Sequence, residues 1–427
     1  MKAFGPAAWC PAASGRAAPS ILFVNRVYPP QRGATGRLLR ELAVRMAAAG
    51  WRVTVVTDGP PGAGDGACPG LTVARTGVGA PWPGAAGYAA ALVRLTLLAL
   101  RQPRHDLVVT MTDPPLLALA GPLLALRHGA ALHWCHDLHP ELFAMAGGRL
   151  WSALSRPLTA LSTAALRRHA AVLAIGDCMA RRLAARGVPA DRIQVLPNWA
   201  QPDLRPAAGD GPDVDGAAGR PFTVLYAGTL GLVHPVGTLA EAAQRLAVRH
   251  SAVRLVIVAE GRRRAELAAR TAGLPNLTLL PHQAPEALRA LAAGADLHLA
   301  LLDGRAAGLQ VPCKVAAALA SGRPVILAGP AEGDASRLLR DSGAGWIVPP
   351  DDGPGLADLI GRLAADPVRV EAAADAARAA GAAWTADLAA AWFGRFCAGL
   401  LARPRAAPTA VETLPAGPLA RPEAPGG

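Results

Sequence analysis

Short runs of consecutive apolar residues alternate with longer stretches of mixed polarity along most of the chain. In the first half these runs fall at residues 21–25, 53–56, 107–109, 131–134, 172–175 and 193–195. Continuous apolar runs separated by helical stretches are typical of a parallel sheet that helices cover on both faces. The first run leads through a glycine-containing loop into a helix that we expect to end near Gly50.

The same pattern restarts after residues 203–220, which are rich in Asp, Gly, Pro and Ala and are typical of an interdomain linker. Further strands are expected at residues 222–226, 255–258, 277–279, 297–300, 325–327 and 345–348. The predicted fold class is therefore α/β, with doubly wound Rossmann-like domains at residues 1–202 and 221–380. Their binding site is expected at the carboxyl ends of the strands, in a cleft between the domains.

The C-terminal part of the chain differs from both domains. Residues 381–402 carry aromatic side chains on an apolar helical face, and residues 403–427 are rich in Pro, Ala and Gly. We expect a helix in the first of these segments and a disordered tail in the second.

Composition limits the class of protein. A hydrophobic content of 52% with 17% charged residues excludes a disordered chain. The 6 cysteines lie far apart, without a CxxC pair or zinc spacing, and are typical of reduced thiols. Residues 1–20 lack the apolar core of a secretory signal, and no uncharged apolar run is long enough to span a bilayer. A cytoplasmic protein is expected, either soluble or peripheral at the inner face of the plasma membrane.

The net charge of +12 is unevenly distributed. Residues 1–200 contain 21 basic and 9 acidic residues, whereas the remainder contains 22 of each. A basic first half indicates an anionic partner, and scattered arginines without interleaved aromatic residues disfavour nucleic acid. A membrane surface or a lipid phosphate fits better. Residues 88–101 and 151–168 supply apolar helical faces for such attachment, although ordinary helices covering a sheet would show the same pattern.

Lys314 is unusual because only Lys2 and Lys314 are lysines among the 43 basic residues. It follows Pro312, at which we expect a helix to begin, and Gly322 should end that helix before a buried strand. A compact ammonium group beside the free N–H groups of a helix start can hold a phosphate. A solvated surface lysine is the alternative.

Two loops combine glycine with a helix start. Gly33 follows the first strand in a loop that is too long and too rich in proline for a GxGxxG dinucleotide motif, which argues against NAD or FAD. Its backbone can approach a diphosphate or a sugar, or it is simply a connection. In the second domain Gly228, Thr229, Gly231 and His234 follow the first strand and leave room for a phosphate-bearing ligand.

A similar turn at residues 259–262 precedes a helix, where Arg262 is a candidate phosphate ligand and solvated arginines are the alternative. The densest group of titratable residues lies at 133–141, after a buried strand. In it, His136 beside Asp137 is suited to position a hydroxyl group or to hold charge at a reacting centre. The histidine spacing of three fits metal coordination poorly at the end of a strand, and a purely structural cluster is a further interpretation. No metal and no cofactor are expected.

Taken together, these segments resemble family 4 glycosyltransferases of GT-B architecture, of the type that assembles bacterial polysaccharide and lipopolysaccharide. The resemblance covers about residues 21–402 and is carried by the first strand with Gly33, residues 136–137, and the segments 174–179, 195–199, 226–231 and 312–325. It implies retaining, metal-independent transfer of a hexosyl group from a UDP- or GDP-linked sugar bound mainly by the second domain. It also implies an acceptor on the first domain, a C-terminal helix that crosses back, and donor binding by Asn198.

Two departures weaken the resemblance. Many members carry two glutamates at the positions of Leu309 and Ala317, and the Arg and Lys pair common after the first strand of the second domain is missing at residues 230–234. Lys314 then remains as the cation for the diphosphate. We expect transfer to a lipid-linked or oligosaccharide acceptor. A nucleotide-sugar epimerase of the same fold and a non-catalytic nucleotide-sugar-binding subunit are the alternatives.

Overall fold

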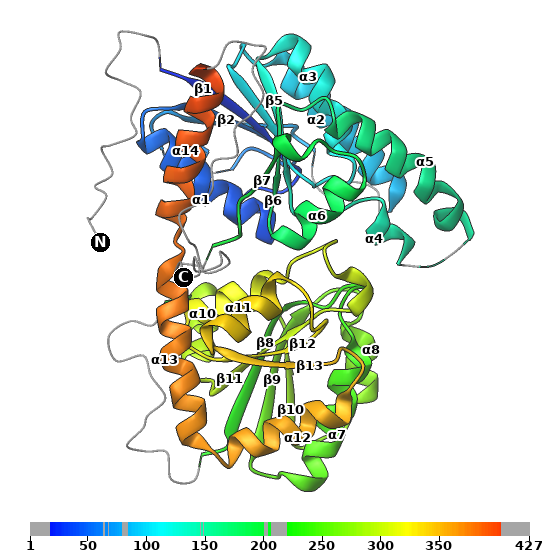
Figure 1. Cartoon of the computed structure of the whole chain (residues 1–427), viewed down its shortest axis with the longest axis vertical. Coiled ribbons are helices and arrows are strands. Elements are labelled where there is room, and N and C mark those ends of the chain that lie inside the picture. The colour runs from blue at the N-terminus through cyan, green and yellow to red at the C-terminus, as the bar shows by residue number, and fades with distance from the viewer. Residues whose placement is uncertain are drawn as a thin grey trace, which may run out of the picture. The chain divides into compact units, whose positions relative to one another are not determined.

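The computed structural model describes residues 18–62, 65–66, 68–78, 84–145, 147, 149–199, 204–205 and 220–402. They form two compact units (Figure 1). Among the described residues, the first unit contains residues 18–197, 308–310 and 386–402, and the second contains the rest of the chain between residues 198 and 385. Apart from residues 204–205 and 220, the expected linker at 203–220 lies outside the described residues, as does the expected tail at 403–427.

The first unit is built on a seven-stranded parallel sheet in the order β3-β2-β1-β4-β5-β6-β7. Six strands match the predicted apolar runs. The additional strand, β3, lies at the edge of the sheet, where polar and partly exposed residues interrupt the apolar pattern. The strands are β1 Ser20–Val24, β2 Arg52–Thr57, β3 Leu71–Arg75, β4 Leu107–Thr110, β5 Ala130–Cys135, β6 Ala171–Ala174 and β7 Ile193–Val195.

Helices cover this sheet on both faces. One core joins α2, η2 and α3 to β1, β2, β4 and β5. Helix α14 packs against α1, and its Phe393 ring lies 6.0 Å from the ring of Phe23 in β1. The α-helices and the 3₁₀ helices (η) are α1 Ala34–Ala48, α2 Ala85–Arg101, η2 Leu117–Ala120, α3 Gly121–Arg127, α4 Glu141–Ala144, α5 Arg149–Leu166, α6 Asp177–Ala185, η3 Ala190–Arg192 and α14 Ala386–Ala402.

The second unit contains a six-stranded parallel sheet in the order β10-β9-β8-β11-β12-β13. Its strands are β8 Phe222–Thr229, β9 Val253–Glu260, β10 Leu277–Leu280, β11 Leu297–Leu301, β12 Val325–Ala328 and β13 Gly345–Val348. Its helices are α7 Val236–Arg249, α8 Arg264–Arg270, α9 Pro285–Gly294, η5 Gly304–Ala306, α10 Cys313–Ala320, α11 Asp334–Ser342, α12 Gly353–Ala364 and α13 Pro367–Ala383.

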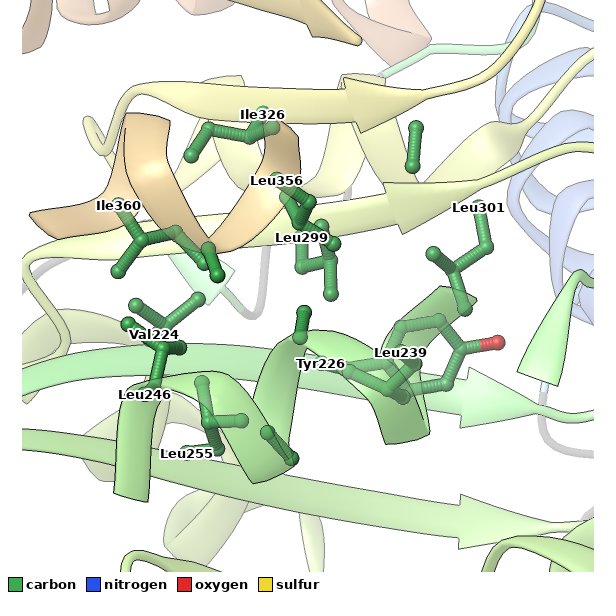
Figure 2. Packing of buried hydrophobic residues seen from close by; sticks show 14 of the residues in the cluster. Val224, Tyr226, Leu239, Leu246, Leu255, Leu299, Leu301, Ile326, Leu356 and Ile360 are labelled. Atoms are coloured by element: carbon green, nitrogen blue, oxygen red, sulfur yellow. The ribbon is translucent and has the colours of Figure 1, made fainter. Parts of the chain in front are cut away.

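The core of this unit explains why its strands are continuous apolar runs in the sequence. Tyr226, Leu299 and Ile326 project from three strands toward Leu239 of α7 and Ile360 of α12, and all five side chains are almost completely buried (Figure 2). Strands buried in this way need no alternation of polar and apolar residues. The predicted α/β class, with two Rossmann-like parallel-sheet domains, is confirmed.

Two local predictions were wrong. β8 and β9 continue in register to the pairs Gly228–Ala259 and Thr229–Glu260, so Gly228 and Thr229 lie in a strand rather than in a turn. The helix expected at residues 381–402 begins only at Ala386, because α13 continues to Ala383. Backbone pairing with β9, not side-chain polarity, decides where β8 ends. No helix among the described residues is long and apolar enough to cross a membrane.

Candidate functional site

Lys314 is the second residue of α10, whose N-terminus is at Pro312 as the sequence predicts. Its Nζ atom lies 3.3 Å from Nε2 of His234 and 5.1 Å from the centre of the Tyr226 ring. Burial lowers the pKa of Lys314 below its ordinary value. Lys314 is therefore a half-buried cation held between two aromatic side chains, not a solvated surface lysine.

Gly228 makes room for this lysine. Its φ angle is +142°, and a Cβ atom at this position would lie 2.5 Å from Cε of Lys314. Any other residue would therefore strain the backbone of β8 and displace the lysine side chain. The two residues are 86 positions apart in the sequence, and the parallel sheet brings their segments together at the carboxyl end of β8.

His234 lies in the loop between β8 and α7, where its Nδ1 atom accepts a hydrogen bond from the N–H of Gly231 at 3.0 Å. Burial and the charge of Lys314 lower the pKa of His234 to about 3, so the ring is neutral near pH 7. A neutral ring that accepts at Nδ1 carries its proton on Nε2. The Nε2–H group and the ammonium group of Lys314 are thus two adjacent donors, which suits an anionic oxygen.

Arg263 holds the His234 loop, a role that the sequence did not reveal. Its Nη1 atom donates to the carbonyl oxygen of His234 at 2.7 Å, and its Nε atom donates to Glu266 at 2.8 Å. The neighbouring candidate, Arg262, is exposed on the loop between β9 and α8. The guanidinium group of Arg263 therefore makes its contacts within the protein, whereas Arg262 remains an exposed candidate for phosphate binding.

The other donor-binding candidates differ in their surroundings. Thr229 is exposed at the end of β8, and its carbonyl accepts from the hydroxyl of Tyr226 at 2.9 Å. Asn198 has a buried Oδ1 atom with no hydrogen-bond partner among the described residues. Gly33 belongs to the first unit, where a Cβ atom would lie 2.9 Å from Cγ1 of Val27. Close packing against Val27 accounts for this glycine.

In the first unit, His136 directly follows β5 and is buried. Its ring lies against Trp134, with the centroids 4.6 Å apart. Neither ring nitrogen forms a hydrogen bond of normal geometry with a described residue. An interaction with the backbone of Trp134 raises the pKa of the ring, but its effect is smaller than that of burial. Burial dominates and lowers the pKa of His136 to about 3. The residue is a neutral imidazole near pH 7, and both of its ring nitrogens are buried.

Asp137 forms an isolated antiparallel bridge with Gln310, which belongs to the same unit. The next residue, Leu138, donates its N–H to the carbonyl of Leu309 at 2.9 Å. Burial, followed by the nearby charge of Asp113, raises the pKa of Asp137 to about 7, and a hydrogen bond from the Gln310 side chain opposes this shift. A carboxyl group with a pKa near 7 can give or take a proton at neutral pH.

Three residues near Asp137 were not predicted from the sequence. Asp113 follows β4, and its carboxylate accepts two hydrogen bonds from Arg26, at 2.6 and 3.0 Å. Arg26 lies just beyond β1, so the rule that parallel strands end at one edge of the sheet could have identified both. Nothing in the local sequence indicates Gln310, because its position depends on the path of a distant loop.

The remaining histidines of this segment, His133 and His139, contact different side chains. Nδ1 of His133 lies 3.0 Å from the hydroxyl of Thr110, and the ring of His139 packs on Phe143 with centroids 4.7 Å apart. Among the described residues, no group of three or more His, Cys, Asp or Glu side chains is arranged to hold a metal ion.

Leu309 and Ala317 stand where many family 4 enzymes carry glutamate. Both residues have apolar surroundings. Leu309 is buried. Ala317 packs against an apolar cluster that includes Leu225 and Val256. A carboxylate would be poorly accommodated at either position unless the surroundings changed.

Comparison with known proteins identifies the class. Residues 33–199 match the Glycosyl transferase 4-like domain, and residues 221–366 match the Glycosyl transferases group 1 domain. Sucrose-phosphate synthase from Thermosynechococcus elongatus has a similar structure, with a TM-score of 0.74, 20% identity, and coverage of 90% of this chain and 99% of that protein. HepE from Anabaena, solved with UDP-glucose, gives a TM-score of 0.66 at 18% identity and covers 89% of this chain and 99% of its own.

These likenesses show the GT-B fold. The chain belongs to the glycosyltransferases that join a family 4-like domain to a group 1 domain, as the sequence resemblance indicates. It is also 26% identical over 253 residues to the putative colanic acid biosynthesis glycosyl transferase WcaI of Escherichia coli K12. That match spans 57% of this chain and 62% of the relative.

Proposed function

We propose that this chain transfers a sugar from a nucleotide diphosphate donor to a glycan acceptor in bacterial polysaccharide assembly. The observation that carries the proposal is the pair of donors formed by Lys314 and His234 beside the glycine at position 228, within the group 1 domain. The relative WcaI is described as a biosynthetic glycosyl transferase, and HepE was solved with UDP-glucose. Both descriptions support a sugar nucleotide as the donor.

In the proposed reaction the bond between the anomeric carbon and the diphosphate oxygen breaks, and the electron pair leaves with the nucleoside diphosphate. The acceptor hydroxyl forms the new bond, and its proton passes to an oxygen of the departing phosphate. Lys314 and the Nε2–H group of His234 stabilise the negative charge that develops on the diphosphate. Retention of configuration and independence of metal are parts of the proposal that rest on the family resemblance.

We assign the acceptor side to the first unit, with a lipid-linked glycan as the acceptor. There His136 offers two buried nitrogens without hydrogen bonds of normal geometry, and Asp137 titrates near neutral pH. These groups are suited to bind hydroxyl groups of the reacting sugar or of the acceptor. The basic character of residues 1–200 is compatible with a phosphate-bearing lipid.

A binding and turnover experiment tests the proposal. Isothermal titration with UDP, GDP and their hexose derivatives should give saturable binding, and addition of lipid-linked acceptors should release the nucleoside diphosphate in the presence of EDTA. Absence of binding to every nucleotide would contradict it. Sugar isomerisation without release would favour the epimerase, and binding without either reaction would favour the non-catalytic subunit.

A further inference from the structure

A small cavity of the first unit lies beside the loop that follows β5. It has a volume of about 20 Å³, and residues from β5, α5 and the end of α6 line it (Figure 1). Thr112, just beyond β4, and the loop residues Asp137 and His139 also form part of its wall. A cavity of this size has room for about one water molecule.

Three buried polar atoms of the lining residues form no hydrogen bond with a described residue, namely Oγ1 of Thr112, Nδ1 of His139 and Nη1 of Arg186. The rest of the Arg186 side chain is held in place, because its Nε atom donates to the hydroxyl of Thr163 at 3.2 Å and its Nη1 atom lies 3.2 Å from a carboxylate oxygen of Glu141. Buried polar groups of folded proteins are nearly always paired, either with the protein or with ordered water. Three such atoms in residues around one cavity therefore indicate a shared hydrogen-bonding partner.

The charges around the cavity favour a neutral occupant. An anion would lie close to Asp137 and would compete with Glu141 for Arg186, whereas a cation would lie against the guanidinium group. A water molecule carries no charge and typically makes about three hydrogen bonds at a buried site. Arg186 can only donate, while the hydroxyl of Thr112 and Nδ1 of His139 can each donate or accept. One water molecule can therefore pair with all three groups.

We propose that one ordered water molecule occupies this cavity and joins Thr112, His139 and Arg186 by hydrogen bonds. The water connects the end of β4, the loop after β5 and the end of α6, which are far apart in the sequence. The same loop carries His136 and Asp137, so the water is a structural part of the wall of the candidate site. This inference goes beyond the proposed function and does not depend on it.

A high-resolution crystal structure of the full chain tests the site directly. One water peak should lie within hydrogen-bond distance of Oγ1 of Thr112, Nδ1 of His139 and Nη1 of Arg186. A cavity without such a peak overturns the proposal. A stronger peak that bromide replaces in a soaked crystal would assign an anion to the cavity and overturn the proposal as well.

Two substitutions of Thr112 separate the hydroxyl group from the packing of the side chain. Thr112→Val keeps the shape and removes the hydroxyl, so the water peak should weaken or vanish and the midpoint of thermal unfolding should fall by about 3 °C or more. Thr112→Ser keeps the hydroxyl and removes a methyl group, so the water peak should remain and the midpoint should fall less. A lower midpoint for Thr112→Ser than for Thr112→Val would show that the methyl group, not the bound water, decides stability at this position, and would overturn the proposal.

Thr96 of α2 provides the matched control. Its hydroxyl donates to the carbonyl of Leu92 in the same helix at 2.7 Å, and Thr96 is not part of the cavity wall. Thr96→Val should leave the water peak in place and lower the midpoint less than Thr112→Val does. Equal losses of stability in the two variants would show that removing any threonine hydroxyl has this effect, which would overturn the assignment. These measurements use neither donor nor acceptor, so they can fail while nucleotide binding and turnover succeed.

Discussion

The ammonium group of Lys314 lies 3.3 Å from Nε2 of His234, and both groups are donors. His234 cannot accept at Nε2 while Nδ1 accepts from the N–H of Gly231 and the ring is neutral. Two donors face each other beside Gly228, and desolvation lowers the pKa of each. An anionic oxygen that accepts from both groups would relieve this arrangement, and a phosphate of the proposed donor would supply such an oxygen.

The first prediction concerns Lys314 itself. Lys314→Ala should weaken binding of UDP or GDP about tenfold or more, since one charge-assisted hydrogen bond is lost. Isothermal titration measures the change. Arg254→Ala is the matched control, because this exposed arginine lies near the amino end of β9, at the opposite edge of the same sheet. Equal affinity of a folded Lys314→Ala variant would remove the lysine from the site.

The second prediction separates backbone strain from displacement of Lys314. Gly228→Ala should destabilise the second unit and weaken nucleotide binding, because the added Cβ atom would lie 2.5 Å from Cε of Lys314. Gly273→Ala is the control, since Gly273 also has a positive φ angle, +77°, but its Cβ atom would contact nothing within 4 Å. The control should lose about 1–2 kcal/mol of stability and keep its affinity for the nucleotide. Similar affinity losses in both variants would show that strain, not Lys314, is responsible.

The third prediction assigns His136 to the reaction rather than to donor binding. His136→Ala should lower turnover by about a hundredfold or more and leave nucleotide affinity nearly unchanged. His139→Ala is the control, because His139 also has its pKa lowered by burial, to about 4, but packs on Phe143. Activity that EDTA abolishes and Mg²⁺ or Mn²⁺ restores would favour a metal role instead.

Most of the fold could be predicted because buried parallel strands leave a clear apolar signature. β3 was missed because only Leu71 of its five residues is buried. The end of β8 was misplaced because Gly228 and Thr229 resemble a turn in the sequence, while their pairing with β9 is made by the backbone. Side-chain polarity carries no information about such pairing.

The candidate residues were predictable to a smaller extent. Lys314 was identified from the rarity of lysine and from its place after Pro312, and the loop of His234 from its glycines. The tautomer of His234 and the hydrogen-bond partner of Asp137 could not be predicted from the sequence, because both depend on the positions of individual atoms in the fold. Gln310 approaches Asp137 from a segment more than 170 positions away, and no local pattern indicates such a contact.

The last prediction follows from the raised pKa of Asp137. In the folded protein its carboxyl group ionises at about pH 7, whereas its ordinary value is 3.8. Between these two pH values the folded state therefore holds a proton that the unfolded chain has released, and the stability associated with Asp137 is lost as the pH rises from about 4 to 7.

Asp137→Asn removes this titration, so thermal unfolding of the variant and of the unsubstituted chain should differ little near pH 4. The melting temperature of the variant should become increasingly the higher of the two up to about pH 7 and stay so above it. Turnover of the variant should at the same time lose a pH-dependent step near pH 7. Asp191→Asn, an exposed aspartate of the same unit, serves as the control and should leave both pH profiles unchanged. A difference in melting temperature that does not vary with pH would show that Asp137 ionises normally in the folded protein.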